Sequence, residues 1–278
     1  YTMYAMVSYQ IFPIAMALNK KHIISWTLFD FANSSYSAVI IAVVFPVYYA
    51  NVIVGNDAGI GDLWWGRAIS VSMAVVAVSS PFLGGISDYG GLRKKFLFLY
   101  TALSVSAIAS LFILEKGMVV EGFMLIVAAN IGMEGGLVFY NSFLPRIAPR
   151  EYQGRVSAWG FMVGYAGSIL SLLIAIPLVK AGQFKATWVM VAFFFAISSL
   201  PAFLFLPKDR KGDFRLVHAG VRGIKYTLAT LKEIWERREP GKFLISYLIF
   251  EDGVNTVIVF SSIFAATTLG FRADELIV

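Results

Sequence analysis

The chain has 278 residues, of which 58% are hydrophobic and 14% charged, and its mean hydropathy is +0.73. Soluble domains carry about 25% charged residues, so this composition indicates an integral membrane protein. The lack of cysteine excludes disulfides and thiolate chemistry, and the two histidines lie far apart in sequence. We therefore expect no metal and no cofactor. The net charge of +6 is expected to reflect orientation in the membrane, with no nucleic-acid partner.

Seven apolar stretches are long enough to cross a bilayer, which takes about 20 residues. They cover residues 23–49, 66–87, 96–114, 118–142, 156–179, 187–206 and 243–269. We predict an all-α membrane protein with four parts. These are an N-terminal extension (1–19), a six-helix bundle (20–206), a cytoplasmic linker with an amphipathic helix (207–241) and the first helix of a second bundle (242–278). Residues 1–19 are interpreted as upstream sequence that is not native, with an extra helix as the alternative.

Basic residues are distributed unevenly between the two sides of the predicted membrane. When the links are assigned alternately to the two sides, 18 of the 23 Lys and Arg residues fall on one side. Basic loops stay in the cytoplasm, so this side is predicted to be inside, together with the N-terminus. The short loops are typical of bacterial proteins. We expect the inner membrane of a bacterium as the location.

A polar stripe opens the first apolar stretch. Asp30, Asn33, Ser34 and Ser37 follow the i, i+3, i+4, i+7 spacing of one helix face. A carboxylate in a membrane helix costs roughly 2.5 to 3.5 kcal/mol, so Asp30 is expected to face the bundle interior or a watery cavity. The seventh stretch repeats this spacing of an acidic residue, an amide and a hydroxyl as Asp252-x-x-Asn255-Thr256. The repeat indicates a duplicated bundle.

The linker over 207–241 contains a second amphipathic pattern. Its apolar residues recur at spacings of three and four, in the order Val217, Val221, Ile224, Leu228, Leu231 and Trp235. One interpretation is a helix on the anionic inner leaflet, and the other is a helix packed against the cytoplasmic ends of the bundle. Pro240 is expected to end this helix.

The fourth stretch carries a second intramembrane carboxylate. Asn130, Glu134 and Asn141 are separated by four and seven residues and share a predicted face, with Tyr140 beside them. Glu134 is about ten residues from the nearest helix end and is expected to face a cavity. We favour a role in substrate or proton coupling. The alternative is a structural Glu that is protonated or hydrogen-bonded to a neighbouring helix.

The link between the second and third stretches reads Gly84-Gly-Ile-Ser-Asp88-Tyr-Gly-Gly91-Leu-Arg93-Lys94-Lys95. Alone, it predicts a glycine turn that basic residues hold inside, with Asp88 able to cap a helix N-terminus. The Gly-x-x-x-Asp-x-x-Gly-x-Arg-Lys pattern resembles the signature loop of the major facilitator superfamily, although Leu92 replaces the usual basic residue. The resemblance implies that Asp88 and Arg93 belong to a charge network that closes the cytoplasmic side.

Further sequence segments narrow the resemblance to one branch of the superfamily. They are Ser25-Trp26, Phe29-Asp30-Phe-Ala-Asn33-Ser34, Asn130-Ile-Gly, Glu134-Gly, Phe139-Tyr140-Asn141, Phe143-Leu144-Pro145 and Gly154-Arg155-Val156-Ser157. Together they resemble the autophagy-related vacuolar amino-acid effluxers and their bacterial relatives. The resemblance implies a twelve-helix transporter whose second half is represented here by its first helix. Amino acids are the substrates that the eukaryotic members suggest.

These features predict a secondary transporter of a small polar solute, such as an amino acid, that works by alternating access. Asp30 and Asn33 would face Asp252 and Asn255 across one cavity. We expect the bilayer and a small substrate as partners, protons as a candidate coupling ion, and a monomer when full length. The alternatives are an enzyme that transfers lipid-linked groups and a non-transporting scaffold. The enzyme is disfavoured because Glu251 and Asp252 are adjacent and point about 100° apart on a helix.

Overall fold

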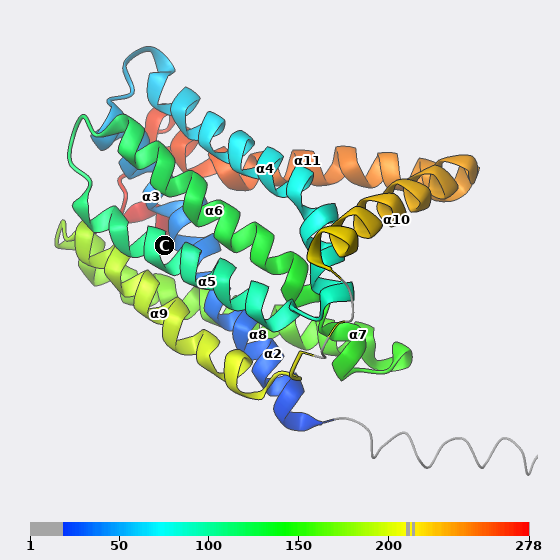
Figure 1. Cartoon of the computed structure of the whole chain (residues 1–278). Helices are drawn as coiled ribbons and strands as arrows, with labels where there is room; N and C mark the ends of the chain where they lie inside the picture. Colours follow the sequence, from blue (N-terminus) through cyan, green and yellow to red (C-terminus); the bar gives the residue numbers. More distant parts are fainter. Residues whose placement is uncertain (1–18, 210–211, 213–214, 278) are drawn as a thin grey trace, which may run out of the picture.

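The computed structural model describes residues 19–209, 212 and 215–277 (Figure 1). The N-terminal extension therefore lies almost entirely outside the described residues. Six helices of the described part are long and apolar enough to cross a membrane. They are α4 (Ile60–Gly90), α5 (Arg93–Ser110), α6 (Val119–Asn141), α8 (Arg150–Lys180), α9 (Phe184–Phe205) and α11 (Arg238–Thr268). The all-α membrane fold is confirmed.

The first predicted span is a broken one. It begins as α2 (Lys20–Ser35), continues as the π-helical segment η2 (Tyr36–Val43), and is followed by the short helix α3 (Phe45–Tyr48) and the π-helical η3 (Tyr49–Val54). The two parts, Lys20–Val43 and Phe45–Val54, are bent by 42° and make a seventh span if they are counted together. Pro46 lies directly after the break, where its missing N–H is tolerated.

Helix α2 lies in the centre of the bundle, where it packs against α8 and α9. Its Phe29 ring stacks on Tyr140 at 4.9 Å and meets the edge of Phe195 at 6.1 Å. A second aromatic group surrounds Phe45, whose ring centroid is 4.9 Å from that of Trp188. All of these side chains are buried and belong to one hydrophobic core cluster. The core therefore fixes α2 between its neighbours.

Glycines on α8 allow the close approach of α2. A Cβ atom at Gly160, Gly164 or Gly167 would collide with α2, where the nearest atoms belong to Trp26, Ser34 and Phe31, respectively. The contact at Gly167 is with the backbone carbonyl of Phe31, which cannot turn aside. These glycines serve helix packing, as expected for small residues in membrane helices.

The amphipathic helix of the linker is α10 (Leu216–Glu236), and it packs on α4. The buried residues of α10 are small, namely Ala219, Gly220 and Gly223, and a Cβ atom at Gly85 of α4 would lie 2.7 Å from the Gly223 Cα. The larger apolar side chains of α10 stay exposed. The face of α10 that carries these small residues therefore packs against the bundle, as in one of the two interpretations.

The prediction that Pro240 ends the linker helix is wrong. Helix α10 ends at Glu236, and Arg237 adopts an extended conformation (φ −92°, ψ 107°) between α10 and α11. Pro240 is the third residue of α11. In the first turn of a helix the missing N–H has no intrahelical partner to lose, so proline is tolerated there.

Candidate functional site

Asp30 lies where three helices meet. Its half-buried side chain comes from α2, next to the Tyr140 hydroxyl of α6 and opposite Gly160 of α8. A Cβ atom at Gly160 would lie 2.8 Å from Asp30 Oδ2, so a glycine is needed to leave room for the carboxylate. We call Trp26, Asp30, Asn33 and Tyr140 the Asp30 cluster.

Two reciprocal hydrogen bonds hold the Asp30 cluster together. Trp26 Nε1 donates to the Tyr140 carbonyl oxygen at 3.2 Å, and the Tyr140 hydroxyl donates to the Trp26 carbonyl oxygen at 3.1 Å. The two rings stack with centroids 4.5 Å apart and planes inclined by 7°. This arrangement fixes the Tyr140 hydroxyl beside Asp30. Sequence reasoning missed Trp26 as a site residue, although an indole within one helical turn of Asp30 is a usable signal.

The four residues of the predicted polar stripe differ in how exposed they are. Asn33 is 4% exposed, and its Nδ2 atom has no hydrogen-bond partner among the described residues. Ser34 donates from Oγ to the Asp30 carbonyl oxygen at 2.7 Å, while Ser37 is exposed. Ser37 lies just after the point, at Tyr36, where the backbone changes from α- to π-helical.

A second polar group lies one to two turns further along α2 and η2. Tyr36 donates from its hydroxyl to Asn130 Oδ1 at 3.2 Å, and Asn130 Nδ2 donates to Ser72 Oγ at 2.7 Å. Tyr36, Asn130 and Ser72 are all buried, and the half-buried Glu134 acts electrostatically on Tyr36. We call these four residues the Asn130 cluster. Its hydrogen bonds join η2, α4 and α6.

Other predicted site residues lie outside both clusters. Asn141 is exposed at the C-terminal end of α6 and belongs to neither cluster. Asp252 and Asn255 are exposed on α11. Helix α11 meets the bundle further along, where Ser262 and Ile263 are buried and the Val259 carbonyl oxygen accepts from Trp65 Nε1 at 3.1 Å. The meeting of Asp252 with Asp30 therefore stays a prediction.

The loop from Gly84 to Lys95, which we call the gating loop after its predicted role, contains an ion pair. Arg93 Nη2 lies 2.7 Å from Asp88 Oδ1, and Arg93 Nε donates to the same oxygen at 2.8 Å. Gly91 ends α4 with a φ of 67°, a conformation that glycine adopts without strain. A Cβ atom at Gly84 would meet nothing within 4 Å, whereas Gly85 makes the close contact with α10.

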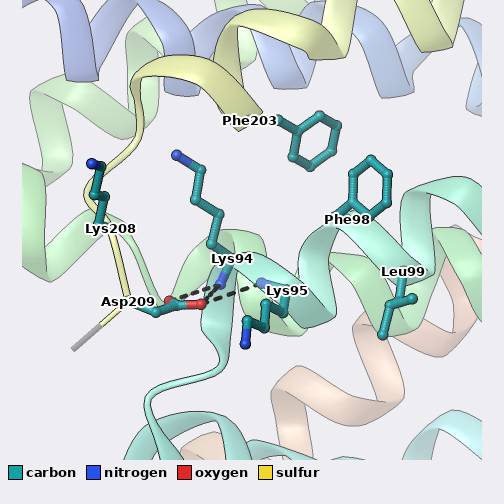
Figure 2. A pocket seen from close by; sticks show the side chains of 7 residues that line it. All are labelled: Lys94, Lys95, Phe98, Leu99, Phe203, Lys208 and Asp209. Atoms are coloured by element: carbon teal, nitrogen blue, oxygen red, sulfur yellow. Dashed lines mark hydrogen bonds between the residues drawn. The ribbon is translucent and has the colours of Figure 1, made fainter. Parts of the chain in front are cut away.

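The helix N-terminus beside this loop is capped by a residue that the sequence did not point to. Asp209, just after α9, accepts hydrogen bonds from the backbone N–H groups of Lys94 at 3.0 Å and Lys95 at 3.3 Å (Figure 2). The Lys94 ammonium donates to the Leu206 carbonyl oxygen at 2.8 Å. Asp88, the predicted capping residue, instead pairs with Arg93. Lys94 thus joins the gating loop to the chain that leaves α9.

Four junctions of the chain meet at this end of the bundle. A cavity of about 590 Å³ is lined by residues at or near the ends of α2, α4, α5, α7 (Leu144–Ile147) and α9, namely His22, Asp88, Gly91, Arg93, Arg146, Pro207 and Asp209. We call it the basic end, because it carries the basic links of the sequence. Within the described residues, no group of three His, Asp or Glu side chains is arranged to hold a metal ion.

The family model for vacuole effluxer Atg22-like proteins matches residues 67–278. The chain belongs to this family. An uncharacterized MFS-type transporter of Bacillus subtilis, YxiO, is 29% identical over 91% of the chain and 62% of its own length. An uncharacterized protein of Aquifex aeolicus is 25% identical over 91% of the chain and 60% of its own length. The chain thus spans about three fifths of these relatives.

Matches to major facilitator transporters extend beyond the Atg22-like family. The major myo-inositol transporter IolT of Bacillus subtilis is 29% identical over 57% of the chain and 35% of its own length. No solved structure matches the chain. Membership of the Atg22-like family confirms the predicted branch of the major facilitator superfamily.

Proposed function

We propose that the full-length protein is a secondary transporter of a small polar solute that bears an ammonium group, such as an amino acid, and that the Asp30 cluster supplies half of its binding site. The observation that carries this proposal is a carboxylate at the junction of α2, α6 and α8 beside the buried amide of Asn33 and the hydroxyl of Tyr140, both of which act on Asp30.

The charges near the Asp30 cluster support a cationic group on the substrate. Asp30 is the acidic residue of the cluster, and the described middle portions of the spanning helices carry no Lys or Arg that would neutralise it. A zwitterionic substrate would place its ammonium group on Asp30. Its carboxylate would then be bound by backbone N–H groups or by the second bundle. The first helix of that bundle is α11, which carries Asp252 and Asn255.

Protons are the proposed coupling ion, and Glu134 is the second carboxylate that could carry them. It lies half-buried next to the Tyr36–Asn130–Ser72 chain of hydrogen bonds, within the membrane-spanning part of α6. Intramembrane carboxylates are typical of proton pathways. The two carboxylates, Asp30 and Glu134, would then separate substrate binding from proton binding, a division that substitutions can test.

An uptake screen tests the proposed function. Vesicles that contain the full-length protein would be given radiolabelled amino acids, amines and polyols, with and without an imposed proton gradient. We expect accumulation of an ammonium-bearing solute that stops when the gradient is collapsed. Flux of an uncharged polyol alone would reject the ammonium assignment. Absence of any flux, with the protein shown to be folded, would favour the scaffold.

The Asp88–Arg93 pair is proposed to act in gating. Asp88→Asn should slow transport roughly fivefold or more by shifting the balance between open and closed states. Thermal stability should change little, because exposed ion pairs contribute about 0–1 kcal/mol. Glu233→Gln is the matched control, since Glu233 pairs with Arg237 at the same 2.7 Å on exposed α10. Equal transport rates for Asp88→Asn and the wild type would remove the pair from gating.

A further inference from the structure

We propose that the pocket between α5 and α9 at the basic end binds an anionic phospholipid of the membrane leaflet on that side. The pocket has a volume of about 510 Å³ and opens on the outer surface of the bundle. Figure 2 shows its two unlike ends. Lys94, Lys95, Lys208 and Asp209 lie at one end, and Phe98, Leu99 and Phe203 lie at the other.

The charged end suits a phosphate-bearing headgroup. Three lysines face a single carboxylate there, and that carboxylate is already engaged. Asp209 accepts from the backbone N–H groups of Lys94 and Lys95 at the start of α5, where the helix dipole further offsets its negative charge. Lys95 and Lys208 are exposed. The rim therefore keeps a net positive charge with two ammonium groups open to a ligand.

The apolar end suits an acyl chain. Phe98 and Phe203 meet edge to face with centroids 5.3 Å apart, which closes the space between α5 and α9. Phe98 is 55% and Leu99 58% exposed, and both belong to a membrane-spanning helix. A soluble anion such as phosphate would gain nothing from this surface, whereas a lipid would cover it. The pairing of a basic rim with an apolar wall between two spans is typical of sites for anionic lipids.

The site is separate from the surface where the bundle meets α11. Helix α11 packs against η2, α3 and α10, whereas the pocket is formed by α5, α9 and the residues that follow α9. Figure 1 shows α5 and α9 on the side of the bundle away from α11. The inference therefore does not depend on the substrate or on the proposed function. The bound lipid would hold Asp209 and the gating loop at one depth in the bilayer.

Native mass spectrometry of the full-length protein in detergent, titrated with phosphatidylglycerol or phosphatidylcholine, tests the proposal. We expect phosphatidylglycerol to bind more tightly than phosphatidylcholine. The double substitution Lys95→Gln/Lys208→Gln should weaken phosphatidylglycerol binding by roughly fivefold to thirtyfold, from about 1 kcal/mol per lysine. The control Lys20→Gln/Lys21→Gln removes the same charge from the exposed start of α2 and should leave binding unchanged.

Three outcomes would overturn the proposal. The first is equal affinity of the wild-type protein for the two lipids, a comparison that needs no variant to fold. The second is equal loss of phosphatidylglycerol binding in the Lys95/Lys208 variant and in the Lys20/Lys21 control, which would indicate a general charge effect. The third is full displacement of phosphatidylglycerol by inorganic phosphate at millimolar concentration, which would indicate an anion site without a role for the acyl chains.

Discussion

Asp30→Asn should strongly reduce proton-driven accumulation of substrate in vesicles that contain the full-length protein. The amide has nearly the same shape as the carboxylate, so it fits between Gly160 and Tyr140, but it neither binds a proton nor attracts an ammonium group. Hydrogen bonds to charged groups contribute about 1.5–3 kcal/mol, so a loss of roughly tenfold to a hundredfold is expected. The control is Glu121→Gln, an exposed carboxylate in the first turn of α6.

Exchange assays distinguish a residue that binds substrate from a residue that binds the coupled proton. If Asp30 binds substrate, Asp30→Asn should also stop exchange of labelled for unlabelled substrate without a gradient. If Glu134 carries the proton, Glu134→Gln should stop accumulation and leave exchange intact. Undiminished accumulation in Asp30→Asn would remove Asp30 from the mechanism. Loss of accumulation in Glu121→Gln would show that the assay responds to any change of charge.

Gly167→Ala should lower the thermal stability of the protein more than any other glycine-to-alanine change in α8. The added Cβ atom would collide with the Phe31 carbonyl oxygen and lie 2.9 Å from its carbon, so the backbones of α2 and α8 would have to separate. Overpacking of this kind costs about 1–3 kcal/mol, which a melting curve of the detergent-purified protein would record as a lower Tm.

Gly154→Ala is the control on the same helix. Its Cβ atom would meet nothing within 4 Å, and alanine is favoured over glycine in a helix by about 1 kcal/mol. We therefore expect an unchanged or slightly raised Tm. Equal effects at the two positions would mean that helix propensity, rather than the α2–α8 contact, governs the response. The α8 glycines would then have no special packing role.

The fold was predictable because membrane spans depend on composition. Long apolar stretches identified the spanning segments, and charged residues marked their ends, although several helices extend beyond the apolar part. Helix α8, for example, begins at Arg150 rather than at residue 156. The π-helical segment after Ser35 was not predicted, since Tyr36–Val43 carries no local signal that separates it from an ordinary helix.

The candidate site was predictable where a polar residue stands out in an apolar helix. Asp30 and Asn130 are of this kind, and both make contacts within the bundle. Ser72 and Asp209 were missed for opposite reasons. Ser72 is one small polar residue among many, and Asp209 acts on α5 across 115 positions of sequence. Long-range pairings of this kind depend on how the helices pack, which no short motif encodes.

The junction between α10 and α11 has a mechanical consequence. Helix α10 is held against α4 because Gly85 and Gly223 bring the two backbones into contact. The larger neighbouring side chains prevent the helices from sliding along each other at this contact. Arg237 alone separates α10 from α11. A change in the angle between α10 and α11 must therefore come from the backbone torsion angles of Arg237, which makes this residue the hinge between the two helices, while α10 stays fixed to the first bundle.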